Sequence, residues 1–250
     1  MTSIRSMKEI EKIHEACKVV AKCHKHIKPF VQPGITTMEL NDIAEKFIRD
    51  QGGIPEQIGY MGYPYATCTS VNDEICHGFP GKYKLKSGDL ITIDTVVNLE
   101  GWLGDSAWSY AVGEVSGKVK KLMETTLKCL YLGIEQAVPG NRIGDISHVI
   151  QTYAEGKGYS VVRDFTGHGI GRVMHDGLAI PHFGKPGRGP RIVPGMVFTI
   201  EPMINTGTWM CKIDDNGWTA RTLDGGLSCQ YEHTIAITEE GPLIMTLQED

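Results

Sequence analysis

The amino-acid sequence predicts an α+β fold: one domain over residues 1–250, made of two similar halves at about residues 1–113 and 114–250. Three observations support this prediction. The 250 residues, 41% hydrophobic and 22% charged, suit a single large globular domain. Two pairs of segments repeat at nearly the same offset. In each half, helical patterns precede extended ones, which is typical of folds with helices on one face of an antiparallel sheet.

The repeat joins two stretches of each half. Residues 33–52 (PGITTMELNDIAEKFIRDQG) resemble residues 139–158 (PGNRIGDISHVIQTYAEGKG), at an offset of 106. Residues 88–94 (GDLITID) resemble residues 195–201 (GMVFTIE), at an offset of 107. Because both matches keep their order and offset, we interpret them as a duplication inside one domain rather than a solenoid. Two such halves that share one sheet would leave a cleft between them.

In the first half, two helices and a hairpin are expected. The segment SMKE at residues 6–9 has the form of a capping box, and apolar residues recur at helical spacing as far as Val20. A second helix is expected over about 37–50, with Thr36 and Glu39 as its capping box. Strands at 90–97 and 102–112 flank the sequence NLEG, which is a hairpin signal.

The second half repeats this order. Apolar spacing predicts one helix over 119–130 and another over about 144–156. Strands at 197–204 and 230–238 form the matching pair, with a longer insertion between them. Residues 113–118 are the expected junction between the halves.

Composition excludes several classes of protein. A net charge of −5 argues against a specific nucleic-acid site. The seven cysteines form no CxxC pair, so free thiols in a reducing compartment are expected. No run of about 18 apolar residues occurs, and residues 1–22 are charged throughout, so we expect neither a membrane span nor a signal peptide. These observations predict a cytoplasmic protein.

Carboxylates occupy strands that are otherwise apolar. Asp94 lies within the sequence ITIDTVV, and Asp105 follows 11 residues later, so a hairpin would let the two face each other. Two adjacent carboxylates repel unless a cation or a shared proton lies between them. The alternative for Asp94 alone is a solvent-facing position at a strand edge.

The second half adds two more carboxylates. Glu201 occupies the repeat position of Asp94, and Glu232 lies where the repeat would put the partner of Asp105. His168 is flanked by glycines, which let the backbone approach an ion closely. Two Asp, two Glu and a nearby His form a set of oxygen and imidazole ligands suited to divalent cations, and to two rather than one. The glycines around His168 lack the spacing of a nucleotide-binding loop.

The motifs around these residues resemble those of type I methionine aminopeptidases, metallopeptidases with the pita-bread fold, over nearly the whole chain. The matching motifs are ID at 93–94, GD at 104–105, TGHGIG at 166–171, TIEPM at 199–203 and QYEHT at 230–234. The resemblance implies one catalytic domain in which the duplicated halves share a curved antiparallel sheet. It also implies removal of the N-terminal methionine from peptides and nascent proteins.

The resemblance assigns ligands and catalytic roles. Asp94, Asp105 and Glu232 would hold one metal ion. Asp105, Glu232, His168 and Glu201 would hold the other. The ions would be cobalt, manganese, iron, nickel or zinc. Glu201 is also the implied proton shuttle. Two further histidines have implied roles: His175 steadies the tetrahedral intermediate, and His77 contacts the substrate near the leaving nitrogen.

The resemblance also implies an apolar pocket for the methionine side chain, since a thioether gains chiefly from burial and aromatic contact. Its implied lining residues are Tyr60, Tyr63, Cys68, Met174 and Trp218. Gln57 and Met174 depart from the residues usual in the family. A monomer is expected, and a contact between the ribosome and the basic residues Lys185, Arg188 and Arg191 stays open.

Two other functions are compatible with the same ligand motifs or the same fold. An X-Pro aminopeptidase or dipeptidase of the same fold shares the five ligands but usually has a separate N-terminal domain, for which 250 residues leave no room. A non-catalytic binding homologue should have lost ligands, whereas all five are in place.

Overall fold

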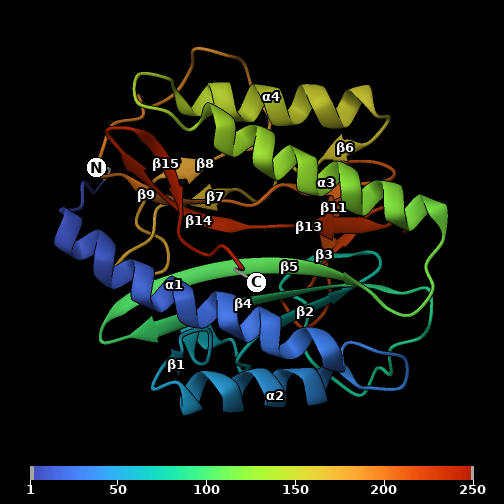
Figure 1. Ribbon diagram of the computed structural model, residues 1–250. Coiled ribbons are helices and arrows are strands. Elements are labelled where there is room, and N and C mark those ends of the chain that lie inside the picture. Colours follow the sequence, from blue (N-terminus) through green and yellow to red (C-terminus); the bar gives the residue numbers. More distant parts are fainter. Residues whose placement is uncertain (1–2, 249–250) are drawn as a thin grey trace.

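The structure, a computed structural model, describes residues 3–248, and the chain folds into four α-helices and several short antiparallel sheets over that range. The helices are α1 (Met7–Ile27), α2 (Thr37–Asp50), α3 (Gly117–Gln136) and α4 (Ile143–Gly156), with short 3₁₀ turns at Lys28–Phe30 and Tyr60–Gly62. Figure 1 shows α1 and α2 beside the strands of the first half and α3 and α4 beside those of the second. The α+β class and the order of elements are as predicted.

Helix starts follow the predicted capping residues. The side chain of Glu9 accepts a hydrogen bond from the Ser6 backbone N–H at 2.8 Å, before α1 begins. At α2, the Glu39 N–H donates to Thr36 Oγ1 at 3.1 Å and the Glu39 carboxylate accepts from the Thr36 N–H at 2.8 Å. Both boxes pair N–H groups that the first turn of a helix otherwise leaves free.

The first half is built around one long hairpin. Strands β4 (Leu90–Leu99) and β5 (Trp102–Ala111) pair along their whole length, and β1 (Ile54–Pro55) and β2 (Cys68–Val71) pair with the other edge of β4. The connection is the two-residue turn Glu100–Gly101, with φ of 53° and 81°. Two positive φ values are typical of a type I′ turn, which matches the twist of a hairpin.

The matching hairpin of the second half is interrupted. β9 (Val197–Ile200) pairs with β14 (His233–Thr238), and β10 (Met203–Asn205) pairs with β13 (Ser228–Gln230) in the same register. Each predicted single strand is thus two strands, broken at residues 201–202 and 231–232. Pro202 has no N–H for the ladder. The Glu232 N–H donates instead to Ala107 O on β5, at 2.8 Å.

That hydrogen bond is one of several that join the halves. Ser106 Oγ donates to the Glu232 carbonyl at 2.7 Å, and Thr234 Oγ1 donates to the Asp105 carbonyl at 2.7 Å. The strands of the two halves therefore meet edge to edge at β5 and β14, beside two of the predicted metal ligands.

The remaining strands are short and flank this centre. β15 (Gly241–Ile244) and β6 (Ser160–Val161) extend the second half, and β7 (Gly167–His168) pairs with β8 (Ala179–Ile180). The predicted insertion contains a second hairpin, β11 (Cys211–Ile213) and β12 (Ala220–Thr222), which pairs with β3 (Glu74–Cys76).

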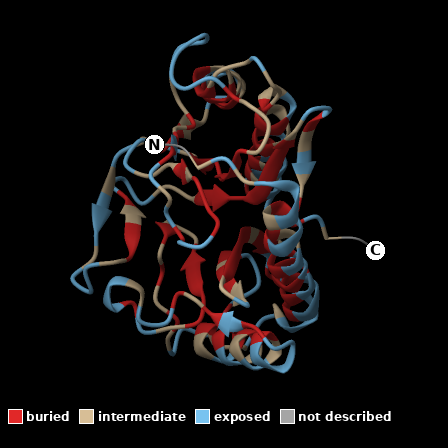
Figure 2. Ribbon diagram, turned by 90° about the vertical axis from the view of Figure 1, so that its left-hand side faces the viewer, coloured by how far each residue is buried: buried red, intermediate tan, exposed pale blue. Residues whose placement is uncertain are grey.

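Apolar side chains form one core under each helix pair, a third between the halves and a small fourth one around β3, β10 and β12. Figure 2 shows buried residues on the strands and inner helix faces, with exposed residues on the outer faces. The third core packs Ile13 of α1 and Leu103 of β5 against Ile170 and Met174. Within residues 3–248, no helix is both long and apolar enough to cross a membrane.

Candidate metal centre and substrate cavity

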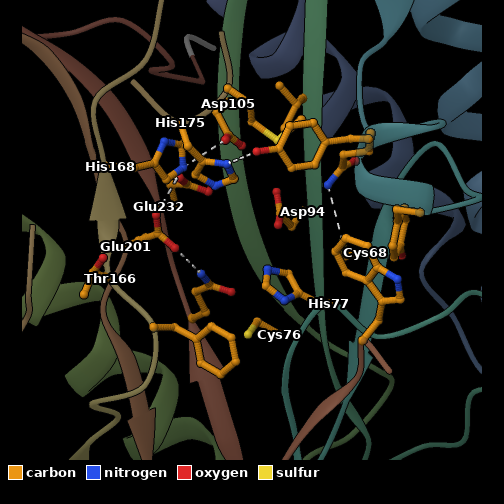
Figure 3. Close-up of a pocket in the computed structure, with 18 of the residues that line it drawn as sticks. Cys68, Cys76, His77, Asp94, Asp105, Thr166, His168, His175, Glu201 and Glu232 are labelled. Atoms are coloured by element: carbon orange, nitrogen blue, oxygen red, sulfur yellow. Dashed lines mark hydrogen bonds and ion pairs between the residues drawn. The ribbon is translucent and has the colours of Figure 1, made fainter. Parts of the chain in front are cut away.

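A cavity of about 220 Å³ lies where the two halves meet. Figure 3 shows acidic and histidine side chains pointing into it from both halves. Every site residue expected from the sequence lines this cavity: Tyr60, Tyr63, Cys68, His77, Asp94, Asp105, His168, Met174, His175, Glu201, Trp218 and Glu232. The fold therefore gathers residues that are up to 172 positions apart, from 60 to 232, around one space.

Three of these side chains lie close enough to share one ion. Ligand atoms of Asp105, His168 and Glu232 all lie within 4.8 Å of one another. His168 Nε2 is 3.5 Å from Asp105 Oδ2 and 3.6 Å from Glu201 Oε1. Asp94 adds a fourth carboxylate from β4, next to Asp105.

The strand register corrects two expected pairings. Asp94 lies opposite Ala107, and Asp105 lies opposite Val96, so the two aspartates are diagonal neighbours on one face rather than a facing pair. The register on either side of the break in the second hairpin puts Glu232 opposite Glu201. Since Glu201 corresponds to Asp94 in the repeat, Glu232 corresponds to Ala107, the residue opposite Asp94, and not to Asp105. The repeat therefore does not relate Glu232 to Asp105.

The acidic side chains raise one another's proton affinity. Burial, together with the charge on Asp105, raises the pKa of Asp94 and of Glu232 well above the ordinary range. Burial raises the pKa of Glu201 to about 7. Burial alone would lower the pKa of His168, but the nearby Asp105 and Glu201 carboxylates raise it to about 9. Without cations, protons must offset the repulsion between these groups.

The residues fit a divalent metal centre. Asp94 Oδ1 and Asp105 Oδ1 are buried and have no hydrogen-bond partner among the described residues. The residues that line the cavity, all within the described part of the chain, include no lysine or arginine that could neutralise the carboxylates. Buried carboxylates are normally paired or bound to metal. Oxygen and imidazole donors suit manganese, iron, cobalt, nickel or zinc.

Neighbouring polar groups orient Glu201. Thr199 Oγ1 donates to Glu201 Oε1 at 2.8 Å and accepts from the His168 N–H at 3.0 Å. Gln230 Nε2 donates to Glu201 Oε2 at 3.1 Å. The Glu201 N–H donates to Nε2 of the buried His182 at 3.0 Å, which supplies a partner where the strand is broken.

Two more histidines flank the carboxylates. The His175 ring lies edge-on to the His168 ring, with 4.3 Å between centroids, and Tyr60 Oη is 2.5 Å from His175 Nδ1. Partial burial and the charge on His168 lower the pKa of His175. Burial lowers the pKa of His77 to about 4, so this ring is neutral near pH 7. His77 adopts φ of 56°, a strained conformation for a non-glycine residue.

Aromatic rings form the apolar part of the cavity. The Tyr63 ring packs edge-on against Trp218 at 5.0 Å, and the Tyr63 hydroxyl donates to the carbonyls of Thr67 and Gly78. Gln57, which departs from the family pattern, donates from Nε2 to Cys68 Sγ at 3.4 Å. Met174, the second departure, is buried and also packs in the core between the halves.

Several lining residues were missed in the sequence. Phe165 and Cys76 lie beside His77, and Thr166, Met203 and Gln230 also line the cavity. All five lie within or next to the sequence motifs of the expected ligands and histidines. That proximity in the chain is the sequence signal that could have identified them. The Thr199 and His182 contacts with Glu201 had no such signal, because they depend on how β7, β8 and β9 come together.

Comparison with known proteins gives a consistent result. Residues 11–239 match the model of metallopeptidase family M24. Methionine aminopeptidase A of Synechocystis is 51% identical over 248 residues, covering 99% of this chain and 98% of that protein. The crystal structure of methionine aminopeptidase from Rickettsia prowazekii superposes with a TM-score of 0.98 at 44% identity and covers 99% and 100% of the two chains. A prolidase from Pyrococcus horikoshii shares the fold, with a TM-score of 0.78 at 23% identity, but this chain covers only 64% of it.

Proposed function

The chain belongs to metallopeptidase family M24, and from this premise we propose that it removes the N-terminal methionine from peptides by hydrolysis of the first peptide bond. The observation that carries the proposal is the cavity itself. An aromatic and thiol-lined recess at Tyr63, Cys68 and Trp218 adjoins the carboxylate and histidine cluster. An apolar recess of this kind suits a methionine side chain, and the cluster suits hydrolysis.

We propose two divalent metal ions in the cluster. Asp94, Asp105 and Glu232 would hold one, and Asp105, Glu232, His168 and Glu201 would hold the other, so that Asp105 and Glu232 bridge. Bound at this place, such ions lower the pKa of a water molecule and polarise the scissile carbonyl.

The residues around the ions would move protons and stabilise charge. Glu201 lines the cavity with Oε1 held by Thr199 and Oε2 held by Gln230, which suits a group that accepts a proton from water and passes it to the leaving amine. The Tyr60 hydroxyl lies 2.5 Å from His175 Nδ1. We propose the tautomer in which Tyr60 donates, because His175 Nε2 then carries the hydrogen and can donate to the oxyanion. His77 lines the cavity, and we propose that its neutral ring contacts the substrate near the leaving nitrogen.

The halves at about 1–113 and 114–250 would act as one catalytic domain, because the cavity takes ligands from both. We propose that the enzyme is a cytoplasmic monomer that acts on nascent chains. Lys185, Arg188 and Arg191 are the residues at which a contact with the ribosome would be tested.

The X-Pro peptidase alternative is not favoured. Relatives named methionine aminopeptidase match this chain over its full length at 42–51% identity, whereas the prolidase structures share only the fold. The non-catalytic alternative is not favoured either, since all five ligands line the cavity.

Three peptides test the proposal: Met-Ala-Ser, Leu-Ala-Ser and Ala-Pro-Ser, each with chelator and with manganese or cobalt. We expect metal-dependent release of methionine only, and none from Asp94→Ala. Asp50→Asn, which alters an exposed carboxylate at the end of α2, is the matched control and should retain wild-type turnover. Preference for Ala-Pro-Ser, or normal turnover by folded Asp94→Ala, would refute the proposal.

A further inference from the structure

The loop that carries His175 leaves β7 at His168 and returns to β8 at Ala179. Two backbone hydrogen bonds close its base: Asp176 N–H to Gly169 O, and Gly169 N–H to Leu178 O, both at 2.9 Å. Because the Asp176 N–H belongs to the peptide bond that follows His175, these bonds hold the backbone at His175, and contacts of the side chain set the direction of its ring. Tyr60 supplies one such contact, on the cavity side.

The N-terminal segment contacts the next residue of the loop, Asp176. Arg5 Nη2 donates to Asp176 Oδ2 at 2.6 Å, and both side chains are largely buried, with exposed fractions of 14% and 7%. The pair joins residues 171 positions apart. Asp176 is the residue directly after His175, so this ion pair acts on the part of the loop that aims the imidazole.

Close packing leaves the ion pair little freedom. A Cβ at Gly169 would lie 2.7 Å from Asp176 Oδ1, and a Cβ at Gly171 would collide with the Arg5 guanidinium. Both glycines are thus needed to let the charged groups reach the loop backbone. Arg5 is itself held by its N–H, which donates to Gly195 O at 2.7 Å just before β9. The backbone from which the Arg5 side chain extends is therefore held in place.

We propose that Arg5 is a positioning residue for the reaction: through its ion pair with Asp176 it holds His175 in the orientation that donates to the oxyanion. This inference rests on the proposed function and extends it to the N-terminal segment. Removing one partner of a buried ion pair leaves the other without compensation, so the loop would move to hydrate Asp176. A shift of about 1 Å in a catalytic group can lower a rate on the order of 100-fold.

Kinetics of Arg5→Met and Arg172→Met test the proposal with the same substitution at two places. Arg172 lies on the same loop but stacks on Trp102, at 4.1 Å from the ring centroid, and is exposed. We expect Arg5→Met to lower kcat for Met-Ala-Ser by about 10-fold or more, with KM changed less than about 3-fold, and Arg172→Met to stay near wild type. Arg5→Lys should recover part of the loss, because it restores the charge.

The His175→Ala background separates positioning from general stability. If Arg5 acts through His175, Arg5→Met should lower kcat less than about 2-fold in that background. The imidazole NMR signals of His175 in the metal-free protein give a second readout that does not depend on turnover. They should broaden or split in Arg5→Met, do so less in Arg5→Met/Asp176→Asn, which leaves no uncompensated charge, and stay sharp in Arg172→Met.

Equal losses of kcat in both backgrounds, or unchanged His175 signals in Arg5→Met, would overturn the inference. The same holds if Arg5→Met only lowers the unfolding temperature and keeps wild-type kcat. Failure of the proposed function is a different result, because the wild-type protein would then release no methionine.

Discussion

The buried His24 on α1 gives a sharp prediction about pH. Its Nε2 lies 2.9 Å from the Ser106 carbonyl, and its Nδ1 lies 3.0 Å from the Tyr110 hydroxyl. Because the carbonyl only accepts, Nε2 carries the hydrogen and Nδ1 accepts from Tyr110. The ring is fully buried, and burial lowers its pKa to about 4 from the ordinary 6.5. The folded protein therefore keeps His24 neutral.

The effect of His24 on the free energy of unfolding, as the pH changes, follows from its pKa values in the folded and unfolded chain. Below about pH 6.5 the unfolded chain binds a proton at His24 that the folded chain does not, so His24 makes unfolding easier as the pH falls. Between about pH 7.5 and 5, a pKa of 6.5 in the unfolded chain and one near 4 in the folded chain give a loss of about 2 kcal/mol. The loss would be complete only below the folded-state pKa of about 4.

Urea unfolding of the wild type and of His24→Asn, both in chelator, measures this effect. His24→Asn removes the titrating ring, and its constant destabilisation cancels when each protein is compared with itself at the two pH values. We expect the free energy of unfolding of the wild type to fall by about 2 kcal/mol more than that of His24→Asn. Equal falls in both proteins would show that His24 is protonated in the folded state and would refute this reasoning.

Three further changes are informative. Gly104→Ala would place a Cβ 2.5 Å from the Cys17 backbone nitrogen, so urea unfolding should show a loss of stability on the order of 3 kcal/mol. Calorimetry should show weaker metal binding, because the adjacent Asp105 would be displaced. Thr199→Val removes the donor to Glu201, and kinetics should show kcat about 10-fold lower or more, while Thr199→Ser stays within about 3-fold. Cys211 is the one incompletely buried cysteine of the seven, all of which lie in the described range, so mass spectrometry should find it alkylated first by iodoacetamide. Burial raises its pKa to about 11, so reaction at pH 7.5 should be slow.

Local sequence signals predicted local structure well. The capping boxes at Ser6 and Thr36 placed the starts of α1 and α2, and the NLEG sequence placed the β4–β5 turn. Each of these signals needs only neighbours within about four residues. The Asp94 and Asp105 pair was also found, since one hairpin brings the two together.

Signals that depend on distant segments were not available in the sequence. Pro202 is a visible signal for a break in the strand, but the hydrogen bond that Glu232 makes to β5 instead of to its own hairpin depends on the tertiary arrangement. The His182 contact with Glu201 and the Arg5 contact with Asp176 need the tertiary arrangement before either partner has a role. The repeat predicted the position of Glu201 but misplaced the register of Glu232, because duplicated halves need not keep equivalent ligands.

The central claim is that the buried carboxylates are compatible with one another because cations neutralise them. The unfolding temperatures of the wild type and Asp94→Asn, each in chelator and in cobalt, test it most directly. In chelator, Asp94→Asn should unfold at or above the wild-type temperature, since one repelling carboxylate is gone; in cobalt the order should reverse, with a wild-type gain of about 3–4 kcal/mol at saturating metal. A wild-type protein that cobalt does not stabilise, with Asp94→Asn equally less stable in both conditions, would contradict the account.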